Sequence, residues 1–190
     1  MNKDKSFTKT NNGWLVLIAC LALLCTLTLP IQVMADKWDQ ATKLTSTEAV
    51  EVPGQILPAG SYWLTLADTD SDRNMVQIWN ADRTHLIRTI LAVPDYVQKT
   101  PDKSIINFAE RPSGQPEAIQ SWFYPGNNFG EEFVYPKTRA KQLAKQTGRP
   151  VLSMPDEQAS GAAQIKQASV KAVTPNGEEI ALQKSPQPSK

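Results

Sequence analysis

The sequence predicts a mainly β protein: an antiparallel β-sandwich or small barrel, with a short helix after the last core strand and a largely disordered C-terminal tail. Short runs of β-branched and aromatic residues recur between residues 49 and 135, separated by Pro and Gly turns. No long amphipathic helical pattern interrupts them. Beyond the first 35 residues, every aromatic side chain lies between Trp38 and Tyr135, so large core-forming residues are confined to this part of the chain.

The first 35 residues predict a secretory signal peptide. Lysines precede an apolar run from Trp14 to Leu29, and Val33 and Ala35 occupy the two positions that a signal peptidase inspects. Two alternatives stay open. The run is long enough to serve as an uncleaved membrane anchor, and the segment ending at Cys20 resembles a lipoprotein cleavage site. All three predict export, to the periplasm, the cell envelope or the exterior.

The remaining chain divides into a β-domain over residues 36–150 and a flexible tail over residues 151–190, with a hairpin at residues 170–182. The tail has no aromatic residue from which to build a core. Asn176-Gly177 between two alternating runs is a strong hairpin signal, although an isolated hairpin is marginal in water.

Within the β-domain the elements follow from local pattern. Residues 75–79 and 84–93, joined by a turn-forming Asn80-Ala81-Asp82-Arg83, predict a hairpin that Pro94 ends. A short helical turn is expected at residues 116–119, and a helix at residues 137–147 that ends at Gly148. The other expected strands are residues 49–52, 61–66, 104–108 and 132–135.

Composition excludes several classes of function. Both cysteines, Cys20 and Cys25, lie in the leader, so the domain has no disulfide and no thiol chemistry. A formal net charge of +1 argues against nucleic acid as a partner. Membrane contact is expected only through the leader, if it is not cleaved. No cofactor is predicted.

Asp68, Asp70 and Asp72 alternate as the first ligands of a calcium loop do. Arg73 stands where such a loop needs Gly, and Trp79 where it needs a bidentate Glu. A solvated loop between two strands is therefore favoured over a metal site.

No catalytic residue is predicted. His85, the single histidine, is expected to lie partly buried in a strand, and no Gly-x-Ser-x-Gly nucleophile motif is present. Carboxylates such as Asp95, Glu110 and Glu132 leave an acid–base hydrolase open. Glu131 and Glu132 are adjacent, so on a strand they would point to opposite faces and could not act as a pair.

The aromatic residues are the candidate binding residues. Exposed on a β-face, they could stack on sugar rings or hold a peptide; buried, they would simply fill the core. The candidates are Tyr62, Trp63, Trp122, Phe123, Tyr124 and Phe129.

Three segments resemble a family of uncharacterised exported bacterial proteins with a small β-domain. They are Pro58-Ala59-Gly60-Ser61-Tyr62, Trp122-Phe123-Tyr124-Pro125-Gly126 and Glu132-Phe133-Val134-Tyr135-Pro136-Lys137. The resemblance covers about residues 36–150 and implies location and fold, without any catalytic residue. We therefore expect a non-catalytic binding or scaffolding module whose partner is an envelope component or protein. The alternative is a hydrolase that uses carboxylates or a bound cation.

Overall fold

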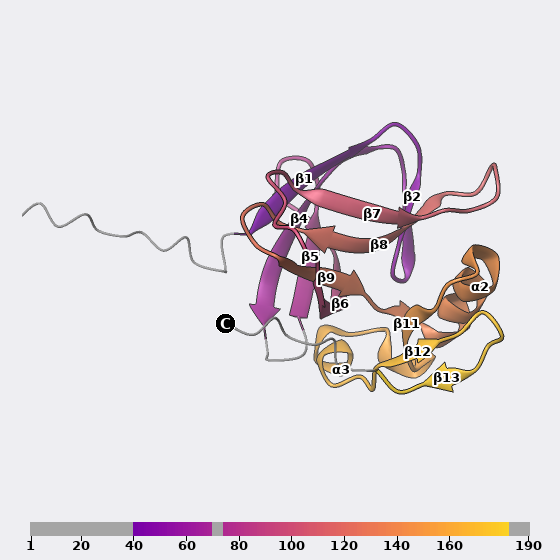
Figure 1. The fold of residues 1–190 in the computed structure, drawn as a ribbon. Coiled ribbons are helices and arrows are strands. Elements are labelled where there is room, and N and C mark those ends of the chain that lie inside the picture. The colour runs from indigo at the N-terminus through magenta and orange to yellow at the C-terminus, as the bar shows by residue number, and fades with distance from the viewer. Residues whose placement is uncertain (1–39, 70–73, 183–190) are drawn as a thin grey trace, which may run out of the picture. The chain divides into compact units, whose positions relative to one another are not determined.

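The computed structural model describes residues 40–69 and 74–182 of the chain (Figure 1). These residues form two β-sheets and a short helix after the core strands, which confirms the predicted mainly β fold class. The predicted signal peptide at residues 1–35 lies outside the described residues and stays a prediction.

The first sheet has nine strands among the described residues, in the order β1-β4-β5-β6-β9-β8-β2-β3, with β7 paired to β8. Neighbouring strands are antiparallel except β2 and β8, which are parallel. The strands are β1 (Ala41–Ser46), β2 (Val50–Val52), β3 (Gln55–Leu57), β4 (Gly60–Thr69), β5 (Asn74–Trp79), β6 (Leu86–Tyr96), β7 (Ile105–Ala109), β8 (Glu117–Phe123) and β9 (Phe129–Phe133).

This sheet rolls around one hydrophobic core and forms an open barrel, the second of the two predicted architectures. One cluster of buried side chains draws members from every strand of the sheet except β7, whose Ile106 and Phe108 pack against it. The indole N–H of Trp122 on β8 donates a 2.9 Å hydrogen bond to Thr42 Oγ1 on β1. Four strands separate β1 from β8 in the sheet order, so only a rolled sheet brings these two side chains together.

The edge of β8 opposite β7 is shared by two strands that diverge. β9 pairs with residues 121–123 of β8, and β2 pairs with residues 117–118, so residues 119 and 120 have a partner in neither. We call the place where β2 and β9 separate along β8 the fork. The Tyr135 hydroxyl is buried there. It donates a 2.8 Å hydrogen bond to the carbonyl of Ile119 and lies 3.3 Å from the carbonyl of Glu51. It thereby supplies a donor that a continuous strand would otherwise provide.

Gln120 is the extra residue of a β-bulge at the same fork. Asn107 of β7 pairs with Ser121, and the next residue, Phe108, pairs with Ile119, which leaves Gln120 out of the register. Bulges redirect side chains and are common beside binding sites.

The second sheet has the order β10-β11-β12-β13. Its strands are β10 (Tyr135–Pro136), β11 (Val151–Met154), β12 (Lys171–Val173) and β13 (Glu179–Ile180). Helix α2 (Lys137–Thr147) connects the parallel pair β10 and β11, and ends at Gly148 as predicted. The 3-10 helix η2 (Asp156–Gln158) and helix α3 (Ala162–Lys166) lie between β11 and β12.

The predicted hairpin at residues 170–182 is confirmed, because β12 and β13 pair antiparallel across the turn that contains Asn176-Gly177. The prediction of a flexible tail is wrong for residues 151–182. This segment adds three of the four strands of the second sheet. It is ordered because its small and aliphatic side chains pack against the outside of the barrel, with Met75 and Leu91 in one cluster and Ala118 in the other.

Two local predictions also fail. Residues 117–119 belong to strand β8 and Pro116 directly precedes it, so there is no helical turn here; β2, β7 and β9 all pair along this strand. Strand β6 continues through Pro94 to Tyr96. Within residues 40–69 and 74–182, pairing with β5 reaches Ala92 and Pro94 pairs only with Glu131 of β9; a position paired on one side tolerates the missing N–H.

A buried ion cluster joins the barrel to helix α2. Glu51 on β2 binds Arg111 at 2.7 Å, and Arg139 of α2 contacts both of its carboxylate oxygens at 2.5 and 2.6 Å. The side chains of Glu51 and Arg111 are only 6% and 4% exposed. Two cations thus compensate one buried carboxylate. Because Arg139 belongs to α2 and Glu51 to the barrel, this ion cluster connects the two regions of the fold.

Candidate functional site

Three of the six predicted aromatic binding residues are core residues. Tyr62, Trp122 and Phe123 are 8%, 1% and 2% exposed, so they do not form an exposed binding surface. Trp63, Tyr124 and Phe129 are half-buried. Within the candidate segment 122–129, Trp122 belongs to the barrel core and Tyr124 packs against it, which matches the alternative that these aromatic residues fill the core.

Nothing in the structure bears on the aspartate loop as a metal site. Asp70 and Asp72, together with the side chain of Asp68, lie outside the described residues. In the described part of the chain, no group of three or more His, Cys, Asp and Glu side chains is placed to hold a metal ion. His85 is exposed in the turn before β6, contrary to the partly buried strand position expected for it.

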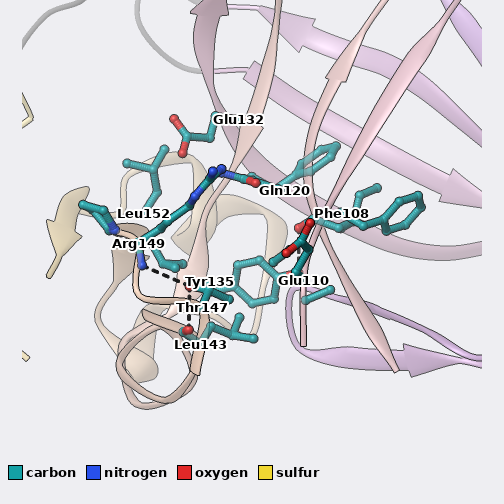
Figure 2. A pocket seen from close by; sticks show the side chains of 15 residues that line it. Phe108, Glu110, Gln120, Glu132, Tyr135, Leu143, Thr147, Arg149 and Leu152 are labelled. Carbon is teal, nitrogen blue, oxygen red and sulfur yellow. Dashed lines mark hydrogen bonds between the residues drawn. The ribbon is translucent and has the colours of Figure 1, made fainter. Parts of the chain in front are cut away.

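The fork between β2 and β9 opens into a cavity of about 130 Å³, which we call the fork pocket (Figure 2). It lies where strands β7–β9 meet α2 and β11. Its lining is Phe108, Ala109, Glu110, Ala118, Ile119, Gln120, Glu132, Phe133, Tyr135, Leu143, Thr147, Arg149, Pro150, Val151 and Leu152.

The pocket combines an apolar wall with a few polar groups. Figure 2 shows Gln120 and Glu132 on one side, and Tyr135 and Leu143 on the other. The end of α2 fixes the rim. Thr147 Oγ1 donates to the carbonyl of Leu143 at 2.9 Å and accepts the backbone N–H of Arg149 at 3.3 Å. Pockets of this kind, apolar with a small number of placed polar groups, are typical ligand sites.

Glu132 is one of two carboxylates that line the pocket. Burial, together with repulsion from Asp95, raises the pKa of its carboxyl to about 7. The register explains the repulsion: Val93 is directly opposite Glu132, and Asp95, two residues further along β6, points to the same face. Near neutral pH this carboxyl can therefore either donate or accept a hydrogen bond.

Its neighbour Glu131 lies on the other face of β9, as predicted. Glu131 is 2% exposed, and both of its carboxylate oxygens lie 2.7 Å from the side-chain amide nitrogen of Asn74. The two glutamates thus have separate environments and do not form a catalytic pair.

The sequence pointed to only part of this pocket. The sequence marks Glu110 and Glu132 as candidate acid–base residues, but no local pattern indicates the bulge at Gln120. Arg149 and Leu152 reach the pocket only because the segment after α2 folds back on the barrel. That return depends on tertiary packing of small and aliphatic side chains, which the positions of the aromatic residues do not indicate.

Comparison of the chain with protein-family models, with curated proteins and with solved structures finds no match to any of them. Among the described residues, no helix is both long and apolar enough to span a membrane.

Proposed function

We propose that this chain is an exported, non-catalytic binding module of the periplasm or cell envelope, and that the fork pocket is its ligand site. The observation that carries the proposal is the placement of Gln120 and Glu132 beside an apolar cavity where two strands diverge. The leader supports export, as the sequence predicts.

The volume of the pocket limits what it can hold. At about 130 Å³ it is close to the ~150 Å³ cavity that accepts a benzene molecule in an engineered protein. The ligand group is therefore one ring or one side chain presented by a larger envelope component. A polar substituent on that group would meet Gln120 and Glu132, while Leu143 and Phe133 would contact its apolar part.

The test is co-sedimentation of the chain lacking residues 1–35, which retains every described residue, with isolated sacculi and with outer-membrane fragments. Thr147→Phe places a ring at the rim and should abolish saturable binding. Lys145→Phe adds the same ring at an exposed position of the same helix and is the matched control. Binding that survives Thr147→Phe would exclude the pocket, and failure to bind either fraction would overturn the envelope proposal.

A carboxylate-dependent hydrolase is the second candidate, because Glu132 and Asp95 share a face and Glu132 has a pKa of about 7. A general acid acting at neutral pH needs such a pKa. Release of new reducing ends from sacculi, lost in both Glu132→Gln and Asp95→Asn, would favour this candidate over the binding module.

A further inference from the structure

Two tryptophans lie side by side on the outer face of the barrel, away from the fork pocket. Trp63 on β4 is directly opposite Trp79 on β5, and both are half-buried. Lys43 on β1 is opposite Trp63, and Leu86 on β6, which is 37% exposed, is opposite Trp79. Residues directly opposite each other share a face, so these four form one row across four strands. We call the row, together with Arg83, the tryptophan shelf.

Arg83 is held over the shelf in an unusual backbone conformation. Its guanidinium carbon lies 3.8 Å from the ring centroid of Trp63. Its φ of 61° is the only positive φ of a non-glycine residue in the described part of the chain. Such positions are strained, persist only where the surroundings enforce them, and concentrate at ligand sites.

The turn between β5 and β6 enforces this conformation. Asn80 accepts the backbone N–H of Arg83 at 3.1 Å and, through its side chain, that of His85 at 3.0 Å. Asp82 accepts both the backbone N–H and the hydroxyl of Thr84. The turn is thus internally hydrogen-bonded, and it places Arg83 on the tryptophan ring before any ligand binds.

Both indole rings are also fixed in advance. Trp63 Nε1 donates to the carbonyl of Ala81 at 3.1 Å, and Trp79 Nε1 donates to Thr65 Oγ1 at 3.0 Å. With their N–H groups occupied, neither ring offers a hydrogen bond. Arg83 already lies over Trp63, so the ring of Trp79 is the one that offers stacking surface. Rings that are already ordered lose little conformational entropy when a ligand stacks on them.

The shelf carries two cationic side chains, Lys43 and Arg83. Neither Lys43 nor Arg83 forms an ion pair within the part of the chain that the structure describes. A guanidinium that stacks by its face keeps its edge free, and that edge matches the two oxygens of a carboxylate. The shelf therefore combines aromatic surface with a pre-oriented receptor for an anion.

We propose that the tryptophan shelf binds an acidic glycan, with a sugar ring against Trp79, beside the stacked Trp63 and Arg83, and a uronate carboxylate on the edge of Arg83. A strand-adding peptide would pair beside β1 and not over the tryptophans, because β4 and β5, which carry Trp63 and Trp79, are each paired on both sides. An anionic membrane surface is recruited by clusters of about 4–8 basic residues, and the shelf has two. This site is separate from the fork pocket and does not depend on it.

The probe is polygalacturonate, titrated into the chain lacking residues 1–35 and followed by tryptophan fluorescence and calorimetry, with neutral dextran and phosphatidylglycerol vesicles in parallel arms. We expect saturable binding of polygalacturonate alone, weakening as salt is added. Glycine adopts a φ of 61° without strain, so Arg83→Gly should keep the thermal midpoint of the protein. The same substitution removes the guanidinium and should weaken binding at least ~10-fold. Lys99→Gln, which removes an exposed cation elsewhere, should leave binding unchanged.

No binding of polygalacturonate, equal binding by Arg83→Gly, or equal binding of dextran would each overturn the proposal. Preferential binding to the vesicles would instead identify a lipid-binding surface and reject the glycan. Thr147→Phe should bind polygalacturonate normally, so failure of the fork pocket and failure of the shelf are distinguishable.

Discussion

The barrel and the region that follows it, residues 134–182, are stabilised in different ways. The barrel encloses a single cluster with large side chains such as Trp122 and Phe133. The second region has two smaller clusters, and each is completed by barrel residues: Met75 and Leu91 in one, Ala118 in the other. The second region therefore has no core independent of the barrel. Residues 151–182, which contain no aromatic residue, are nevertheless an integral part of the fold, because the barrel supplies the other half of their core.

Truncation after Pro150 gives the largest expected effect. It removes the buried side chains of Leu152, Met154, Ile165 and Val173. At about 1.5–3 kcal/mol for each, the loss is on the order of 6–12 kcal/mol, comparable to the whole stability of a typical domain. We expect loss of the cooperative thermal transition, measured by circular dichroism.

Truncation after Leu182 is the control and should preserve the transition, since it keeps every element of the second sheet. An unchanged midpoint after truncation at Pro150 would show that the barrel is independent of residues 151–182, and the comparison between the two regions would fail.

Predicting the fold from sequence succeeded where the signal is local. The helix at residues 137–147 and the hairpin at residues 170–182 were identifiable because Gly148 and Asn176-Gly177 specify their own geometry. The boundary at residue 150 was wrong because aromatic content locates the barrel core but not the alanines, valines and leucines that pack on its outer face. The candidate site was the least predictable part of the molecule, because the fork requires β2 to pair with β8. No local sequence pattern encodes a parallel pairing between residues that are distant in the chain.

Glu51→Ala tests the joint between the two regions. Removing this carboxylate leaves Arg111 buried beside Arg139 without a counter-charge, and breaking a buried ion pair in this way costs about 3–5 kcal/mol. Urea denaturation should show this loss as a lower midpoint with an unchanged slope.

Glu179→Ala is the matched control, because Glu179 also binds two cations, Lys137 and Lys171, but at the surface. Solvent screens that network, so its removal should change the midpoint little. Equal effects of the two variants would mean that burial does not distinguish the two carboxylates.

Glu132 predicts a smaller, pH-dependent effect at the pocket between the two regions. A carboxyl pKa of about 7 in the fold, against 4.5 when exposed, means that the folded state binds more protons between these values. The free energy of unfolding should therefore fall as pH rises from about 4.5 to 7, by up to about 3 kcal/mol at 1.36 kcal/mol per pKa unit.

Glu132→Gln should remove this slope and stabilise the protein at pH 8, as measured by urea denaturation at pH 5 and pH 8. Glu110→Gln, a substitution of another carboxylate that lines the same pocket, should retain the slope. A pH dependence that persists unchanged in Glu132→Gln would place its origin elsewhere.

The parallel pairing of β2 with β8 also constrains the order of folding. β4, β5 and β6 pair with their neighbours in sequence, and such local contacts form early because closing short loops costs little entropy. Val50, in contrast, pairs with Glu117, which lies far from it in the sequence, so a long loop must close before this contact forms. A chain that emerges from its N-terminus first, from a ribosome or through a membrane pore, cannot close the barrel until Phe133 has emerged, because β9 joins β6 to β8. The topology itself therefore delays barrel closure, so most of the chain can pass through a ribosome tunnel or membrane pore before the barrel has formed.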